Sequence, residues 1–503
     1  MDSYSRDSAR ALPVILTFFL CAAVFAGTFF ALLHFVGLPQ SARAQEAGEE
    51  ALSPEEAMPP AEEISGESMA IATPEPQEPV QEPPEEETPE SEGVTVPVLG
   101  TLIETREDTV NFSFIGDILF DGNYATGSTM SARGGFANCL DAGTRELMQS
   151  ADVLVANNEF TYTNTAEAFP GKTYTFRARP ETVQWLKDAG VDLAALANNH
   201  VFDFQEQGLL DTLDTLDAAG VPHIGAGRDI AEAKRPAYYT IVRRADSAPQ
   251  EAEAADVSGT DSAPQEAADA SGTDSAAQDA ETTDPSVAES GAQDTEAEDA
   301  AQNADEGTVL LREGDVSMTV AVLNANQIER YENPETRGAG EGLPGVFRCW
   351  DPSALYEAVR EAKQSADLCI VFMHWGTEKE SQPDWYQTSQ AQGLAEAGAD
   401  LIVGAHPHCL QSVDCVGGVP VFYSLGNFLF TSFTLDTGLL QVELSPEEKE
   451  VRNLRFVPML QEGCTVRLLS GAEKERVLQE IRDYSGQNAI SVDEDGNMFM
   501  KRF

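Results

Sequence analysis

Short apolar runs alternate with helical sequence patterns along most of this chain, and this alternation limits its fold more than any other feature. The runs cover residues 110–115, 153–156, 193–197, 318–323, 368–373, 401–403 and 419–425. Helical patterns between several of them cover residues 181–189, 206–219, 352–365 and 383–397. Three of these patterns end in Ala-Gly directly before the next run, and a glycine just past a helix suits a left-handed cap. Helices and strands that alternate with short joints predict an α/β fold.

The net charge of −54 over 503 residues is concentrated in two acidic tracts. Residues 45–97 contain 16 acidic residues, residues 245–306 contain 18, and neither tract contains Lys or Arg. Both tracts are poor in large apolar side chains and cannot bury enough surface to fold, so we expect both to be disordered. A chain this acidic should also repel nucleic acid and anionic lipid headgroups, which we exclude as partners.

The second acidic tract lies between two strand-like segments, residues 238–242 and 317–322. We therefore interpret residues 245–306 as a disordered insert within one folded domain that covers residues 109–465. A boundary between two domains at this point is the less favoured alternative. Residues 466–503 are expected to form a helical extension that follows the domain.

The N-terminal region has the pattern of a membrane anchor. Residues 1–10 are polar and carry Arg6 and Arg10, and an apolar run follows over residues 11–38. Such a run can cross a bilayer core about 30 Å thick and is longer than the core of a signal peptide. Because the arginines precede it, we expect a single-pass protein of the cell membrane with residues 1–10 in the cytoplasm. Residues 39–108 would then be a disordered, extracytoplasmic stalk. Cleavage at the Ala-Arg-Ala sequence of residues 42–44 is the alternative, and it would release the protein.

The chain has seven cysteines, one of which, Cys21, lies in the apolar run. An oxidising compartment would permit disulfides among the other six, although their spacing does not reveal a pairing. No two cysteines form a C-x-x-C pair, so a zinc site built from cysteines is not expected.

Polar residues gather where six of the apolar runs stop. In α/β sheets, ligands bind in the crevice beyond the carboxyl ends of the strands. Six strands that bring Asp, Glu, Asn and His to one edge therefore predict a functional site there. The residues concerned are Asp117, Asn157, Asn158, Glu159, Asn198, Asn199, His200, His374, His406, His408 and Asn427.

The histidines sharpen this prediction, because the chain contains only six. Four of them, His200, His374, His406 and His408, follow predicted strands and lie beside Asp, Glu and Asn. Mixed sets of imidazole and carboxylate ligands suit hydrolytic sites with two transition metals. In an extended backbone His406 and His408 would point the same way, so they would serve two adjacent metals.

The ordered set of motifs resembles the CapA family of capsule and poly-γ-glutamate synthesis proteins. That family is similar to the calcineurin-like metallophosphoesterases, which implies an α/β sandwich of two sheets flanked by helices, with a dinuclear metal site. The motifs that carry the resemblance lie in the family's order between residues 109 and 430. They are Gly116-Asp117-Ile118-Leu119, Asn157-Asn158-Glu159, Asn198-Asn199-His200 with Asp203, His374-Trp375-Gly376 with Glu378, residues 404–408 and residues 424–428.

The resemblance also implies residue roles. His200 would donate a hydrogen bond to the substrate or act as the general acid, oriented by Asp203 or Asp192. Asn158, Glu378 and Asn427 would contact the substrate. Six residues would bind two divalent transition metals (Mn, Fe or Zn): Asp117 and His408 the first, Asn199, His374 and His406 the second, with Glu159 bridging them.

The sequence departs from the family pattern at three positions. Leu119 stands where most phosphoesterases of the superfamily have a histidine ligand, so the first metal is expected to have one ligand fewer. Asn158 replaces the usual Leu, and Lys379 replaces the usual aromatic residue. Hydrolysis of a phosphate ester therefore does not follow from the resemblance.

These observations predict a membrane-anchored, extracytoplasmic hydrolase or transferase that depends on metal. Its substrate would be an anionic surface polymer or a precursor, in capsule or poly-γ-glutamate synthesis or export, and other capsule-synthesis subunits would be its protein partners. Two alternatives stay open: a capsule-assembly factor without catalytic activity, and a phosphoesterase unrelated to capsule. The four histidines, with Asp117 and Glu159, favour a working metal site over a scaffold.

Overall fold

The computed structural model describes residues 93–245, 307–328, 336–486 and 488–500. The predicted cytoplasmic tail, the anchor, the stalk as far as residue 92 and almost all of the acidic insert lie outside these ranges. Among the described residues, no helix has both the length and the apolar character that a membrane crossing requires.

A seven-stranded mixed sheet contains the strands that flank the insert. Its strands in spatial order are β16 (Val413–Val416), β17 (Val419–Phe422), β15 (Leu401–Ala405), β14 (Leu368–His374), β12 (Val316–Asn326), β10 (Ala237–Arg243) and β2 (Thr101–Thr105). The run from β12 to β17 is parallel, whereas β10 is antiparallel to β12. β10 and β12 pair from Ala237↔Val322 to Arg243↔Val316, so the chain leaves and re-enters the same sheet around the insert.

A second sheet has ten strands. Its path is β22 (Ile490–Val492), β23 (Asn497–Met500), β20 (Glu450–Glu462), β19 (Leu435–Ser445), β3 (Val110–Ile118), β4 (Val153–Asn158), β7 (Leu193–Ala195) and β8 (His223–Ile224), with β18 (Asn427–Leu429) beside β3 and β21 (Thr465–Leu468) beside β20. β3, β4, β7, β8 and β18 are parallel, so their carboxyl ends reach the same edge.

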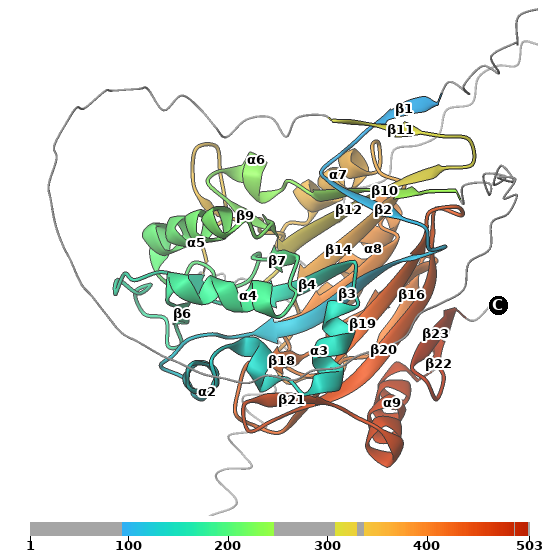
Figure 1. Cartoon of the computed structure of the whole chain (residues 1–503). Helices are drawn as coiled ribbons and strands as arrows, with labels where there is room; N and C mark the ends of the chain where they lie inside the picture. The colour runs from blue at the N-terminus through green and yellow to red at the C-terminus, as the bar shows by residue number, and fades with distance from the viewer. Residues whose placement is uncertain (1–92, 246–306, 329–335, 487, 501–503) are drawn as a thin grey trace, which may run out of the picture. The chain divides into compact units, whose positions relative to one another are not determined.

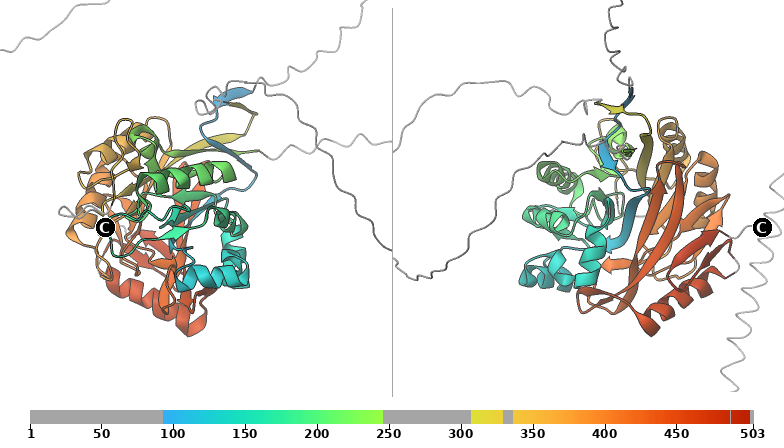
Figure 2. Two further views of the ribbon diagram at one scale, coloured as in Figure 1. Left: turned by 90° about the vertical axis from the view of Figure 1, so that its left-hand side faces the viewer. Right: turned by 45° about the vertical axis from the view of Figure 1, so that its right-hand side comes forward.

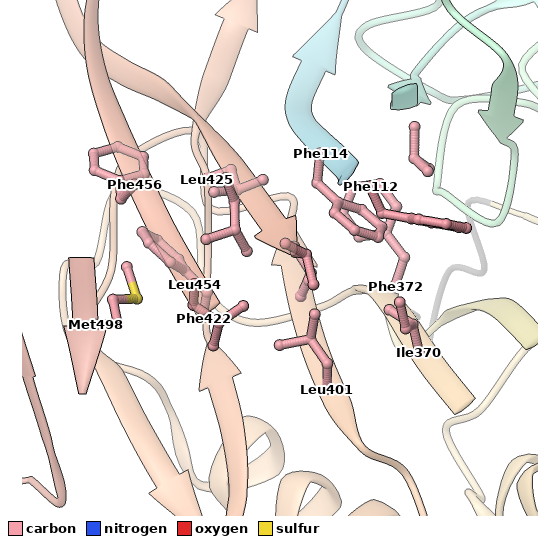
Figure 3. Packing of buried hydrophobic residues seen from close by; sticks show 14 of the residues in the cluster. Phe112, Phe114, Ile370, Phe372, Leu401, Phe422, Leu425, Leu454, Phe456 and Met498 are labelled. Carbon is pink, nitrogen blue, oxygen red and sulfur yellow. The ribbon is translucent and has the colours of Figure 1, made fainter. Parts of the chain in front are cut away.

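The two sheets pack face to face around a shared apolar core. Phe112 and Phe114 of β3 meet Tyr239 of β10 and Phe372 of β14 edge to face, with ring centroids 5.2 and 5.8 Å apart. Figure 3 shows Phe112, Phe114 and Phe372 together in this core. Ile115 of β3 packs into a different cluster on the outer face, so this strand is buried on both sides and reads as a continuous apolar run.

Helices cover the outer face of each sheet (Figures 1 and 2). On the ten-stranded sheet lie α2 (Ala125–Arg133), α3 (Ala142–Gln149), α4 (Gln184–Asp188) and α5 (Gln205–Ala219), with the 3₁₀ turns η1 (Phe136–Cys139) and η2 (Pro180–Val183). On the seven-stranded sheet lie α7 (Ser353–Ala362) and α8 (Trp385–Ala397), with the short α6 (Ile230–Ala233) packed beside them. The predicted α/β fold with two sheets flanked by helices is confirmed.

Three small two-stranded sheets complete the described residues. They are β1 (Val94–Pro97) with β11 (Thr308–Leu311), β5 (Thr161–Tyr162) with β6 (Arg177–Ala178), and β9 (Ala226–Gly227) with β13 (Gly345–Val346). β5 and β6 follow β4 in the chain, and they carry it away from the edge of the large sheet.

The predicted glycine caps are present. Gly190, Gly220 and Gly398 follow α4, α5 and α8, and their φ angles of 83°, 66° and 107° lie in the left-handed region that glycine tolerates best. α8 begins with a capping box in which Asp384 and Gln387 each accept a hydrogen bond from the other's backbone N–H.

Two predicted boundaries were wrong. Residues 93–108 were assigned to a disordered stalk, but β2 pairs with β10 and closes one edge of the seven-stranded sheet. This strand is stabilised by its partner rather than by an apolar pattern of its own, so the sequence did not reveal it. The helical extension predicted for residues 466–503 contains α9 (Gly471–Ser485), but β21, β22 and β23 around it belong to the ten-stranded sheet. The domain therefore continues at least to residue 500.

Candidate metal centre

The predicted ligands converge where the carboxyl ends of strands from both sheets meet. β3 carries Asp117, and Glu159 directly follows β4, so two carboxylates come from the ten-stranded sheet. β14 ends at His374 and β15 is followed by His406, so two imidazoles come from the seven-stranded sheet. All four residues are buried. The strands therefore fix the backbone positions from which these side chains project.

The ligand atoms form two groups that share Glu159. One group is Glu159, His374 and His406, the other is Asp117, Glu159 and His408, and in each group the atoms lie within 4.8 Å of one another. Asn199 joins the first group, since its Oδ1 lies 2.8 Å from Nε2 of His374. All six ligands predicted from the sequence are thus brought together, with the carboxylate of Glu159 common to both groups.

Hydrogen bonds hold the second group in place. Nδ1 of His408 lies 3.0 Å from Oδ2 of Asp117 and 2.8 Å from Oδ1 of Asn427. The amide of Asn157 donates to Oδ1 of Asp117 over 2.7 Å. Burial acts to lower the pKa of His408, but its hydrogen bond to Asp117 and the charge of Asp117 outweigh burial and raise the pKa.

The donor set fits a divalent cation. Among the described residues, no hydrogen-bond donor satisfies Oε1 of Glu159, although the side chain is completely buried. Nε2 of His374 lies 3.7 Å from this oxygen and 3.0 Å from Nδ1 of His406, so candidate ligand atoms of three side chains lie close together. Burial, followed by the neighbouring Asp117, raises the pKa of Glu159 well above its ordinary value. A cation among these atoms would satisfy all of them at once.

The expected extended backbone at His406 and His408 was wrong. Their φ angles are 96° and 57°, so both residues are in left-handed conformations beyond the end of β15. Such conformations are costly for residues other than glycine and concentrate at functional sites. The turn is held by Lys379, whose N–H donates to the carbonyl of Pro407 over 2.7 Å. The two rings still reach different ligand groups. The turn separates them, and not the alternation of side chains along a strand.

His200 lies beside the centre and is oriented by Asp203. Its Nδ1 is 2.7 Å from Oδ2 of Asp203, which leaves Nε2 facing Oε1 of Glu159 at 4.0 Å. Asp192, the alternative partner, instead accepts the backbone N–H of Leu154. Burial, and then the positive charge of Lys172, lower the pKa of His200 well below its ordinary value.

Three residues of this site were not found from the sequence. Nζ of Lys172 lies 2.6 Å from Oδ1 of Asp203 and also donates to the carbonyl of Asn199, with only 3% of its side chain exposed. The rings of Phe176 and Phe430 pack against His200 and His408, at centroid distances of 4.2 and 4.8 Å. None of the three follows a predicted strand, so the pattern that revealed the ligands gave no signal for them.

The predicted substrate contacts differ in their surroundings. Asn158 is completely buried, and its amide donates to the carbonyl of Phe160, so direct contact with a substrate does not fit this position. Glu378 is exposed and close enough to His408 for its charge to raise the pKa of that imidazole. Asn427 contacts His408, and Leu119 is buried among apolar side chains, where it offers no ligand.

Comparison with known proteins identifies the family. The model of the family described as "Bacterial capsule synthesis protein PGA_cap" matches residues 111–432, which include every candidate ligand. The chain belongs to this family. It is 26% identical over 343 residues to the "PGA biosynthesis protein CapA" of Bacillus subtilis (strain 168), and the match covers 67% of this chain and 68% of the relative.

A second relative and a solved structure extend the comparison. The chain is 27% identical over 336 residues to the "Capsule biosynthesis protein CapA" of Bacillus anthracis, covering 66% of this chain but only 62% of that relative. A Mycoplasma pneumoniae protein described as a novel phosphatase matches at 12% identity with a TM-score of 0.31, over 70% of this chain and 94% of that one. Its TM-score is too low to carry an argument about this fold.

Proposed function

We propose that this PGA_cap family protein is a dinuclear-metal hydrolase or transferase of the calcineurin-like type. It would act on an anionic surface polymer, or on a precursor, during capsule or poly-γ-glutamate synthesis. The observation that carries the proposal is the completely buried Glu159, which is shared by two convergent ligand groups. A buried carboxyl group is stable either with a bound proton or beside positive charge, and a pair of metal ions would supply that charge.

Each side chain has a part in this proposal. Asp117, Glu159 and His408 would hold one ion, and Asn199, His374 and His406, again with Glu159, would hold the other. Two such ions supply a Lewis acid that polarises the substrate and lowers the pKa of bound water. Nε2 of His200 faces the shared carboxylate, so His200 would hydrogen-bond the reacting oxygen there while Asp203 holds the ring by its other nitrogen.

The names of the two Bacillus relatives refer to PGA and capsule biosynthesis, and neither name states a reaction. The missing ligand at Leu119 favours one rival function, an assembly factor that keeps the fold without turnover. Bound metal would distinguish the enzyme from the assembly factor. The substrate that is turned over would distinguish an enzyme that acts on the polymer from an unrelated phosphoesterase.

The test combines metal analysis with activity on phosphoesters and on γ-glutamyl polymer. His374→Ala removes a ligand and should sharply lower the metal bound per chain. The matched control is His223→Ala, because His223 pairs with Asp217 away from the centre and its loss should leave bound metal unchanged. His200→Ala should retain metal while turnover falls by roughly 10²–10⁴-fold. Wild-type protein that binds no transition metal, and is unaffected by His374→Ala, would overturn the proposal in favour of the assembly factor.

A further inference from the structure

A polar pocket is lined by residues that follow β3 and β4 in the chain. Its volume is ≈ 530 Å³. The segment that follows β3 forms one wall and β6 forms another. Figure 1 shows α2 and β6 beyond the end of β3, on the side to which that strand points. The pocket therefore lies at the same end of β3 as Asp117.

The lining of this pocket is cationic, although the chain carries a net charge of −54. Arg177 and Arg179 both contribute to it, together with the amide side chains of Asn123 and Asn164. Among the described residues that line the pocket, Asp121 is the only carboxylate. Two arginines that line one hollow of so acidic a protein would attract an anion.

Asp121 does not neutralise the two arginines. It is only 2% exposed, and its Oδ1 accepts the backbone N–H of Asn123 at 2.8 Å and the amide of Asn123 at 2.9 Å. Its Oδ2 accepts the backbone N–H of Arg177 at 2.9 Å. Both oxygens are thus occupied in building the loop and the start of β6, rather than in binding a guanidinium.

The guanidinium of Arg177 is held in place by uncharged groups. Nη1 donates to the carbonyl of Thr165, and the guanidinium carbon lies 5.1 Å from the ring centroid of Phe204. Arg179 is 3.4 Å from Glu181, but both side chains are about two-thirds exposed, at 68% and 64%, and such pairs bind weakly. Both arginines therefore retain N–H donors for an anionic group.

One short strand links the pocket to the metal centre. Phe176 directly precedes Arg177; its ring packs on His200, and its N–H donates to Asp203 over 2.6 Å. The next N–H along the chain, that of Arg177, donates to Asp121 in the pocket. In the other direction, Asp121 lies four positions after Asp117, which limits their Cα atoms to a separation of about 14 Å. A flexible polymer would span this distance with a few of its units.

We propose that Arg177 and Arg179 form a subsite for a carboxylate of an acidic polymer whose neighbouring bond lies at the metal centre. The inference rests on the proposed function and names the chemistry of its substrate. Guanidinium groups bind carboxylates through paired N–H donors, and the surrounding amides add neutral donors. The subsite would hold the polymer in register, while the metal centre would act on the bond a few units away.

Equilibrium binding of a short γ-linked glutamate oligomer to the full-length protein tests this subsite. Arg179→Gln and Arg177→Gln should each weaken binding by about threefold to tenfold, and the double variant by their product if the two contacts are independent. Arg177→Lys keeps the charge and should recover part of the loss. Arg145→Gln is the control, because Arg145 lies in a separate hollow on α3 and should not change binding. The same oligomer with amidated carboxylates should not bind.

Two further measurements decide between this inference and its rivals. No candidate metal ligand lines the pocket, so oligomer binding at the subsite should persist after the metal is removed with a chelator. If binding and its dependence on the arginines survive in a protein without metal, the subsite stands even if the proposed function fails. Unchanged affinity in a folded double variant would overturn the subsite and leave the metal centre untouched. Displacement by inorganic phosphate at equal concentration would overturn the preference for carboxylate.

Discussion

Glu159 connects the energetics of this protein to its chemistry at the scale of a single residue. Its side chain is completely buried beside Asp117, and the two carboxylates would repel each other if both were ionised. A buried charge without a partner costs several kcal/mol, which is why burial raises the pKa of Glu159. In the absence of a cation, the fold therefore favours a proton on this group, and a metal ion must compete with that proton.

Metal affinity is therefore expected to rise with pH. The cation needs ionised Glu159, whose pKa is raised, so protons compete most strongly at low pH and are released on binding. His374 does not oppose this trend, because burial and the neighbouring His406 lower its pKa and keep it neutral. Chelator competition at a series of pH values measures the effect. Affinity that does not fall as the pH is lowered would contradict this expectation.

Lys172 should be among the most sensitive residues for stability. Its ammonium group pairs with buried Asp203 at 2.6 Å, and both side chains are at most 3% exposed. Lys172→Met would leave this carboxylate buried without its counter-charge and should cost about 3–5 kcal/mol in the free energy of unfolding. Denaturant unfolding measures the loss.

Two variants control this experiment. Lys187→Met removes an exposed lysine that donates to the carbonyl of Ala219, and it should change stability by less than about 0.5 kcal/mol. Adding Asp203→Asn to Lys172→Met removes the orphaned charge and should recover part of the loss. A double variant no more stable than Lys172→Met alone would show that charge pairing is not the cause.

The sequence revealed the candidate ligands more readily than the residues that hold the site in place. Asp117, Glu159 and His374 stand at the ends of apolar strands, and parallel strands bring such ends together. Lys172 and Phe176 lie in an irregular stretch between β5 and β6, so only the folded chain places them beside His200. Contacts of this kind depend on long-range packing and leave no local pattern.

Whole strands also differ in how readily the sequence reveals them. The strands predicted from the sequence are buried on both faces and appear as continuous apolar runs, as in β14 and β15. β19 and β20 were not predicted, because half-buried positions interrupt the buried ones along both strands and neither strand carries a polar residue to the site. Gly438 also interrupts β19, where a side chain would meet the ring of Phe456 at 2.3 Å. Glycine is needed there because β19 packs closely against β20, and this contact leaves no local pattern in the sequence.

The acidic insert can be tested as an element of the fold. Residues 246–306 lie outside the described ranges, whereas β10 and β12 on either side pair along their whole facing lengths. Replacing these residues with a short Gly/Ser linker should leave bound metal unchanged. It should not lower the melting temperature, because each halving of a flexible loop reduces its closure cost by about 0.6 kcal/mol. A large fall in melting temperature would show that the tract packs on the domain.

At the scale of the whole molecule, neither half of the chain can build the centre alone. Asp117 and Glu159 belong to the ten-stranded sheet, whereas His374 and His406 belong to the seven-stranded sheet that completes after the insert. The core between the sheets therefore sets the distance between the carboxylates and the imidazoles within each ligand group. A substitution that changes this spacing would affect both groups, even where it touches no ligand.

The N-terminal sequence predicts that the domain lies outside the cytoplasm. The apolar run over residues 11–38 follows two arginines, and such charges are retained on the cytoplasmic side of a membrane. Protease added to intact cells should therefore digest the domain, while a cytoplasmic marker protein stays intact until the cells are lysed. Replacing Ala42 and Ala44 with bulky residues distinguishes anchoring from cleavage: it should leave an anchored protein unchanged, whereas it should stop release into the medium if these alanines form a cleavage site. A domain that remains protected until lysis would place it in the cytoplasm and remove any direct contact with a polymer outside the cell.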